Sequence, residues 1–315
     1  MPEESAQCFC VVTPCYNEAD VVDLFYEQLK PVLQSVPDLQ HRILFVDDGS
    51  RDGTLDRLNA LAARDPAVRV YSLSRNFGHQ IALTAGLDAA RGDAVILMDS
   101  DLQHPPALIP EMIRLWRQGN DVVSAVRKTT DDPGLFKRLS SRAFYRFINA
   151  LSDTPVVTGA ADFCLLSRPA HRALRRLPER HRFLRGMVSW IGFKRAFVFF
   201  EAPRRPAGRS KYTFLKMFQL ALNATFSFST TPIRLATQMG LFTVFLSLLY
   251  LAFVLVCYFR DLPLAPGWAS IIFIVTFLGG VQLAFVGILG EYIARIFEEV
   301  KRRPLYLFKQ KPPAD

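Results

Sequence analysis

The stretch LMDSDLQHPP, residues 97–106, places two aspartates, Asp99 and Asp101, directly after an apolar run that begins at Ala94. The run has the length and composition of a buried strand. Residues i and i+2 of a strand point to the same face, so these two carboxylates would repel each other unless a cation lay between them. Mg²⁺ and Mn²⁺ typically take one or two carboxylates together with phosphate oxygens of a substrate. The stretch therefore predicts a site for Mg²⁺ or Mn²⁺.

Residues 1–200 alternate between short apolar runs and amphipathic stretches. The runs FCVVTP, RILFVDD, VRVYSLS, DAVILMD and DVVSAV have the composition of strands. Strands that alternate with helices predict parallel βαβ units, whose ligands bind at the carboxyl ends of the strands. Glu18, Asp48 and the pair Asp99 and Asp101 follow three of these strands, so we expect them to share one crevice. No GxGxxG or GxxxxGK(S/T) pattern follows the first strand, which argues against a dinucleotide fold and a P-loop kinase.

Two long uncharged segments follow, at residues 235–259 and 268–290. About 20 apolar residues span a bilayer, so each segment is long enough for a transmembrane helix; a buried helix of a soluble protein is the alternative. Lys and Arg are frequent before Arg234 and after Glu291, whereas the turn between the segments has one Arg and one Asp. Because positive residues stay on the cytoplasmic side, we expect a multi-pass protein of the inner (plasma) membrane with both termini and the N-terminal domain in the cytoplasm.

The net charge of +9 is interpreted as attraction to anionic lipid and to phosphate ligands. Nucleic-acid binding is the alternative, but we find no motif for it. The 5 cysteines are scattered, and the spacing of Cys8 and Cys10 fits no metal site, so we expect reduced packing residues. The start, MPEESAQCFCVV, has neither the basic nor the apolar region of a signal peptide.

These patterns divide the chain into four parts. We predict a cytoplasmic catalytic domain at 1–212, an interfacial amphipathic segment at 213–233, two transmembrane helices within 234–293 and a cytoplasmic basic tail at 294–315. The interfacial segment has an apolar face and few charges, as expected for a helix lying at a membrane surface; packing against the catalytic domain is the alternative.

Motifs in a fixed order resemble the family 2 glycosyltransferases of GT-A fold. The first half carries VVTPCYNEAD, FVDDGSRDGT, LSRNFGHQIALTAGLDAARGD and LMDSDLQHPP. The second half carries ADFCLLSR, RFLRGMVSWIGF, RRPAGRSKY, TTPIR and GILGEYIARIFEEVKRRPLY. These later motifs are similar to the membrane-anchored polyprenyl-phosphate branch, which includes bactoprenol glucosyltransferases and dolichol-phosphate mannose synthases. The resemblance covers nearly the whole chain.

The resemblance implies an α/β GT-A domain with a mostly parallel, Rossmann-like sheet, followed by the interfacial helix and the transmembrane hairpin. It implies transfer of a sugar from a nucleotide sugar, such as UDP-glucose, to undecaprenyl phosphate at the cytoplasmic face, with inversion. A GDP-mannose-dependent mannose synthase and a non-catalytic membrane adaptor are the alternatives. A processive polysaccharide synthase would need a QxxRW motif and further helices, and neither is present. The oligomeric state stays open, a homo-oligomer included.

The resemblance also implies roles for individual residues. The nucleotide-sugar pocket comprises Pro14, Tyr16, Glu18, Asp48, Asp99 and Ser100; the metal ligands are Asp101, Gln103 and Asp99. The residues expected to bind the acceptor phosphate are Arg127, Arg138, Arg205, Ser210 and Lys211, and the catalytic residues are Asp101, Asp162 and Arg127. Asp162 would orient the reacting centre or accept a proton, a loop cap being the alternative. A lipid phosphate is already anionic near neutral pH, so positioning and charge stabilisation carry most of the catalysis.

Some of these residues have simpler interpretations. Glu18 would also suit a helix N-terminus, and we expect Asp47 to cap a turn and Asn17 to be a helix N-cap. Three residues depart from the family pattern: Ser100 replaces Ala or Gly, His104 replaces an acidic residue, and Cys164 stands where many relatives carry Arg. We expect the Cys164 position to lack a cation near the sugar or the acceptor.

Overall fold

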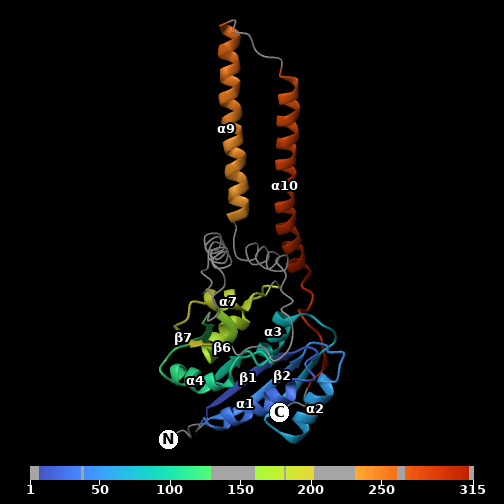
Figure 1. Cartoon of the computed structure of the whole chain (residues 1–315), viewed down its shortest axis with the longest axis vertical. Helices are drawn as coiled ribbons and strands as arrows, with labels where there is room; N and C mark the ends of the chain where they lie inside the picture. The colour runs from blue at the N-terminus through green and yellow to red at the C-terminus, as the bar shows by residue number, and fades with distance from the viewer. Residues whose placement is uncertain are drawn as a thin grey trace. The chain divides into compact units, whose positions relative to one another are not determined.

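The computed structural model describes residues 7–36, 39–128, 160–180, 182–201, 231–260 and 267–311. The chain forms two compact units. The sheet unit contains the N-terminal part of the chain and, in addition, the residues from Arg303 onward, whereas the helical unit contains the two long helices (Figure 1).

The described residues of the sheet unit contain eight strands in the order β7-β5-β6-β4-β1-β2-β3-β8. Their bounds are β1 Cys8–Cys15, β2 Gln40–Asp47, β3 Val68–Leu73, β4 Ala94–Leu97, β5 Val122–Arg127, β6 Ala160–Ser167, β7 Arg195–Phe200 and β8 Phe308–Gln310. Strands β1 to β4 pair in parallel, as do β5 and β7, while β6 and β8 are antiparallel to their neighbours. The predicted α/β class with a mostly parallel sheet is confirmed.

Helices cover both faces of the sheet (Figure 1). On one face lie α1 (Val22–Gln34), α2 (Thr54–Arg64) and α4 (Ile109–Arg117), preceded by the 3₁₀ helix η1 (Pro106–Leu108). The main hydrophobic core lies between these helices and the sheet. The amphipathic spacing of α1 explains its packing, because the residues three and four apart, such as Phe25 and Leu29, are the ones that are fully buried.

The opposite face carries α3 (His79–Ala89), α6 (Arg168–Arg175) and α7 (Leu184–Trp190). Helix α3 packs directly on β1 and β2. Its close approach requires a glycine, since a Cβ atom at Gly86 would lie 2.2 Å from Cγ1 of Val12. Helix α3 is thereby fixed with its first turn at the strand ends, where the acidic residues are.

The end of the chain returns to the sheet unit. Strand β8 pairs antiparallel with β3, and the Ser74 amide donates a hydrogen bond to the Leu307 carbonyl (2.8 Å). The Tyr306 hydroxyl donates to the Asp88 carboxylate (2.9 Å). Within the segment predicted as a basic tail, 294–315, the first residues belong to a helix that ends at Lys301, and residues 308–310 form an edge strand. The cytoplasmic location of this segment stays a prediction.

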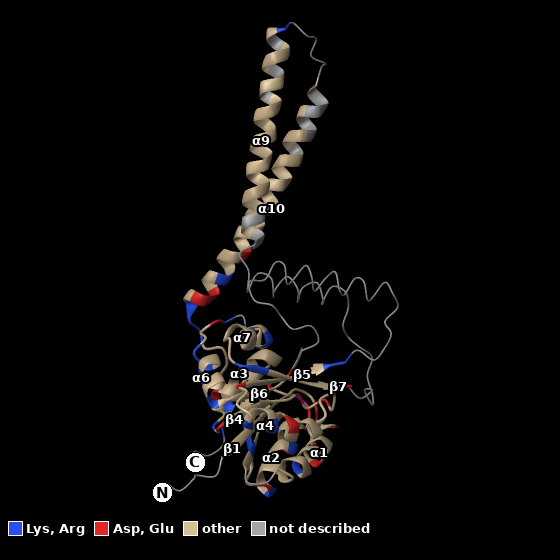
Figure 2. Ribbon diagram, turned by 90° about the vertical axis from the view of Figure 1, so that its left-hand side faces the viewer, with Lys and Arg blue, Asp and Glu red and all other residues tan. Residues whose placement is uncertain are grey.

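The described residues of the helical unit form α9 (Thr231–Phe259) and α10 (Trp268–Lys301). Both are long and apolar enough to cross a membrane, by length and composition, over Ala236–Cys257 and Phe277–Lys301. The large apolar side chains that the structure describes on these two helices are mostly exposed. The charged residues of α10 collect toward its Lys301 end (Figure 2). Most of the segment predicted to lie at the interface, residues 213–230, is outside the described residues.

Candidate active site

The predicted acidic residues gather at one edge of the sheet. Strands β1, β2 and β4 end there, and β6 begins there because it runs antiparallel to β4, with Leu97 opposite Cys164. Asp48 and Asp99 follow β2 and β4, and Asp162 lies near the start of β6. The antiparallel register therefore brings Asp162 to the edge that the earlier parallel strands define.

Asp47, the last residue of β2, forms hydrogen bonds within the protein. It is buried, and its carboxylate accepts hydrogen bonds from the Ser50 amide (3.1 Å) and the Ser72 hydroxyl (2.8 Å). The interpretation of Asp47 as a turn cap is confirmed.

Asp48 is also buried, and it holds the segment that precedes α3. Its two carboxylate oxygens accept hydrogen bonds from the backbone amides of Phe77 (2.8 Å) and Gly78 (2.9 Å). Burial raises the pKa of Asp48 above its ordinary value, although the two amides oppose that effect. Gly78 has a φ of 100°, a conformation that favours glycine, so the turn into α3 depends on this residue.

The loop after β1 is tied to the loop after β2. The side-chain oxygen of Asn17 accepts a hydrogen bond from the Arg51 amide (2.9 Å), and the Glu18 amide donates to the Thr54 hydroxyl (2.9 Å). The expectation that Asn17 is a helix N-cap is wrong, because the N-cap of α1 is Val21. Asn17 instead connects the loops after β1 and β2, and rules for local helix capping do not predict such a long-range contact.

Three residues predicted for the nucleotide pocket differ in exposure. The Tyr16 side chain is exposed, whereas Pro14 and Ser100 are buried. The Ser100 hydroxyl donates a hydrogen bond to the Pro14 carbonyl (3.1 Å), which joins the ends of β1 and β4. The role of all three in nucleotide binding stays a prediction.

Asp99 lies between two histidines. Its Oδ1 is 2.7 Å from Nε2 of His79, and its Oδ2 is 3.6 Å from Nδ1 of His104. Burial alone would raise the pKa of Asp99, but the hydrogen bond and charge of His79, with smaller contributions from His104 and Arg185, hold it below its ordinary value. Burial would lower the pKa of His79, yet Asp99 raises it.

His104, which departs from the family pattern, packs as a neutral ring. It is buried and stacks on Phe163 with ring centroids 5.3 Å apart. Burial lowers the pKa of His104, and its Nδ1 accepts a hydrogen bond from the Asp99 amide (3.3 Å). The residue therefore orders the loop that carries the two aspartates.

Asp101 and Gln103 form a tight turn. Oδ1 of Asp101 accepts a hydrogen bond from the Gln103 amide (3.0 Å), and Leu102 between them has a φ of 59°. Within the described residues, no group of three or more His, Cys, Asp and Glu side chains could hold a metal ion. A site of one or two carboxylates suits Mg²⁺ or Mn²⁺, which take their other ligands from substrate phosphate and water. The donor set of Asp101, Asp99 and Gln103 fits such an ion.

Asp162 is held by residues that the sequence reasoning missed. Its Oδ1 and Oδ2 accept hydrogen bonds from Nε (2.7 Å) and Nη2 (2.9 Å) of Arg185. Oδ2 also accepts one from Nε2 of Gln80 (3.3 Å). The sequence carries a signal for both partners: Gln80 and His79 are polar residues that begin an apolar helix in NFGHQ, and Arg185 lies in the family-like motif RFLRGMVSWIGF.

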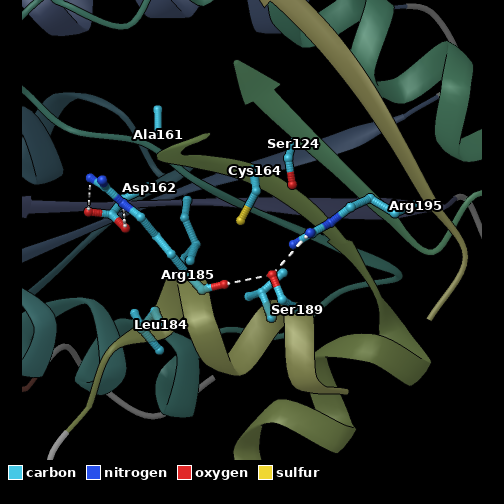
Figure 3. A pocket seen from close by; sticks show the side chains of 10 residues that line it. Ser124, Ala161, Asp162, Cys164, Leu184, Arg185, Ser189 and Arg195 are labelled. Atoms are coloured by element: carbon cyan, nitrogen blue, oxygen red, sulfur yellow. Dashed lines mark hydrogen bonds and ion pairs between the residues drawn. The ribbon is translucent and has the colours of Figure 1, made fainter. Parts of the chain in front are cut away.

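Two arginines from other elements lie beside Cys164, the position where many relatives carry Arg. Cys164, Arg185 and Arg195 line one pocket, which Ser124, Asp162 and Ser189 also line (Figure 3). Burial raises the pKa of the Cys164 thiol to about 12, so the thiol is neutral. Arg195 donates a hydrogen bond to the Ser189 hydroxyl (3.1 Å). The guanidinium groups come from α7 and β7, which follow Cys164 in the sequence.

Of the basic residues predicted at the acceptor phosphate, the structure describes Arg127. It is exposed at the end of β5. Arg138, Arg205, Ser210 and Lys211 lie outside the described residues, so their roles stay predictions.

Known proteins with similar sequences agree on one family. Residues 10–175 match Glycosyl transferase family 2. The chain is 40% identical over 300 residues to the SfII prophage-derived bactoprenol glucosyl transferase of Shigella flexneri, covering 95% of this chain and 97% of that one. It is 41% identical over 300 residues to the putative glycosyltransferase CsbB of Bacillus subtilis, covering 95% and 91%.

Among solved structures, the mannosyltransferase PcManGT from Pyrobaculum calidifontis, in complex with GDP-Man and Mn²⁺, is 16% identical. The match has a TM-score of 0.49 and covers 71% of this chain and 64% of that one. The family match extends over more than half of the chain, and the curated relatives are similar over nearly all of it. The protein is a glycosyltransferase, and its chain belongs to glycosyl transferase family 2.

Proposed function

We propose that this enzyme transfers a hexose from a UDP-sugar, such as UDP-glucose, to undecaprenyl phosphate at the cytoplasmic face of the membrane. The observation that carries the proposal is the similarity, over 95% of the chain, to a relative named bactoprenol glucosyl transferase. That similarity extends beyond the sheet unit to the two long apolar helices, which suit an enzyme whose acceptor is a membrane lipid.

The acceptor supplies its own nucleophile. An anionic phosphate oxygen of the lipid attacks the anomeric carbon while the bond from that carbon to the diphosphate breaks, and the nucleoside diphosphate leaves. Attack on the face opposite the leaving group inverts the anomeric configuration. Because no strong base is needed, the protein contributes mainly position and complementary charge.

The carboxylates at the strand ends would bind the donor. Asp101, with Asp99 and Gln103, would hold Mg²⁺ or Mn²⁺, which supplies positive charge to the diphosphate. Asp48 would position the base or ribose, with the exposed Tyr16 beside it. The Phe77 and Gly78 amides that donate hydrogen bonds to Asp48 immediately precede His79, the first residue of α3.

The acceptor phosphate would be bound by basic residues. We assign this role to Arg127, Arg138, Arg205 and Lys211, together with the hydroxyl group of Ser210. Charge-assisted hydrogen bonds to phosphate are the strong kind, and guanidinium groups can form two at once. The excess of Lys and Arg flanking the apolar helices supports a cytoplasmic location for this site.

The experiment that tests the proposal supplies isolated membranes with undecaprenyl phosphate and a panel of labelled nucleotide sugars that includes UDP-glucose and GDP-mannose. We expect label from UDP-glucose to enter the organic phase as a lipid-linked monosaccharide, and membranes with the Asp101→Asn variant are the control. Label transferred from GDP-mannose alone would replace the glucosyl assignment by a mannosyl one. Absence of lipid-bound label from every donor would reject the acceptor.

A further inference from the structure

A second ion pair in the site joins Asp162 to Arg185 of α7. The guanidinium donates from two nitrogens to the two carboxylate oxygens, at 2.7 and 2.9 Å. The Asp162 side chain is only 7% exposed, whereas that of Arg185 is 40% exposed. The Asp162 carboxylate is therefore buried, whereas the Arg185 guanidinium that binds it is partly exposed to solvent.

Gln80 fixes the same pair from α3. Its Nε2 donates to Oδ2 of Asp162 (3.3 Å), while its Oε1 accepts a hydrogen bond from the Leu184 amide (3.0 Å) at the start of α7. One side chain therefore locates both the carboxylate and the helix that carries Arg185. The neighbouring residue, His79, pairs with Asp99, so the first turn of α3 contacts both carboxylates, those of Asp99 and Asp162.

We propose that Arg185 is a positioning residue that holds Asp162 as an oriented, charge-compensated hydrogen-bond acceptor, which excludes Asp162 as the proton acceptor of the reaction. This inference rests on the proposed function for the identity of the acceptor, but not for the role of the pair.

The number of available acceptor positions supports this role. An ionised carboxylate has about four lone-pair positions. Arg185 takes two of them and Gln80 takes a third. About one position remains, which suits a single hydrogen bond from a hydroxyl group of the donor sugar. Both oxygens of this carboxylate already accept hydrogen bonds from the bidentate guanidinium, and an anionic lipid phosphate gives it no proton to remove.

A double-mutant cycle distinguishes positioning from direct contact with a substrate. The variants are Arg185→Met, Asp162→Asn and the double variant, assayed in detergent for kcat and for the KM of the nucleotide sugar. We expect each single variant to lose roughly 10- to 100-fold in kcat, with the KM changed less than about 3-fold. The double variant should be no slower than Asp162→Asn alone, because Arg185 acts through Asp162.

Two further variants separate this role from a purely structural one. Arg185→Lys keeps the charge but loses the planar fork, so it should remain impaired at least about 5-fold while folding normally. Arg185→Ala should recover activity when methylguanidinium is added, since the site of Arg185 is open to solvent. Arg114→Met, which removes a bidentate pair with Glu111 on the surface of α4, is the matched control and should keep wild-type kcat.

Losses that multiply in the double variant would mean that Arg185 contacts a substrate itself, and would overturn the proposal. Wild-type kcat in a folded Arg185→Met or Arg185→Lys variant would do the same. If the wild-type enzyme transfers no label to lipid, the proposed acceptor is rejected, but the role of Arg185 is not. The double-mutant cycle is then measured by the release of nucleoside diphosphate from the donor.

Discussion

Nε2 of His79, at the start of α3, lies 2.7 Å from Oδ1 of Asp99, which follows β4. The two residues are on separate elements, and the contact depends on how closely α3 packs on the sheet. Asp99 raises the pKa of His79, against the effect of burial, and His79 helps to lower that of Asp99. The pair is therefore charged over a defined range of pH.

The first prediction concerns that range. The raised pKa of His79 means that its stabilising effect is complete below the ordinary value of 6.5 and is lost as the pH rises through the raised value. The lowered pKa of Asp99 means that its effect is present above 3.8 and is lost as the pH falls. His79→Gln should thus lower the unfolding temperature more at about pH 5.5 than at about pH 8, in the presence of chelator. An equal decrease at both pH values would contradict a charged pair.

The second prediction concerns the metal. Two carboxylates and a diphosphate in one crevice need a cation, so chelation should abolish transfer and Mg²⁺ or Mn²⁺ should restore it. Asp101→Asn should reduce kcat at least ~100-fold, because it weakens the compensation of charge on the leaving group. Full turnover in excess chelator, or a near-normal Asp101→Asn enzyme, would remove Asp101 from the metal site. Asp56→Asn, on the surface of α2, is the control.

The third prediction separates donor from acceptor. Arg205→Ala should leave nucleotide-sugar binding almost intact in calorimetry but reduce transfer to polyprenyl phosphate by roughly 10- to 150-fold, since a charge-assisted contact is worth about 1.5 to 3 kcal/mol. Arg204→Ala, which we assign to the general lipid-facing charge, should change transfer little. If donor affinity falls in step with transfer, Arg205 belongs to the donor site.

The fourth prediction concerns the end of the chain. Truncation after Arg302 would remove β8, the Tyr306–Asp88 hydrogen bond and the contact of Phe308 with Tyr71, whose ring centroids are 5.2 Å apart. We expect the free energy of unfolding of the sheet unit to fall by at least about 1 to 3 kcal/mol, the contribution of the Tyr306 hydrogen bond and the aromatic pair, with the lost pairing of β8 to β3 in addition. Truncation after Lys311 keeps β8 and should have no effect. Equal unfolding temperatures for the two truncations would show that β8 does not stabilise the sheet.

The sequence was sufficient for features that depend on local periodicity. The alternation of apolar runs and amphipathic stretches predicted the strands from β1 to β5 and the helices between them. The acidic residues at the ends of these strands, Asp48 and Asp99, were predicted to share one edge because parallel strands must end together. The two long helices were predicted from their uninterrupted apolar composition.

Only the tertiary structure decided the contacts between distant segments. Asn17 is a residue type that often caps helices, but its side chain accepts a hydrogen bond from the Arg51 amide in another loop. Cys164 shares its pocket with Arg185 and Arg195, which come from later elements. The basic end of the chain was expected to be a tail, but residues 308–310 pair with β3. Local pattern carries no information about such pairings, because they depend on helix packing and strand register that form only when the whole domain is assembled.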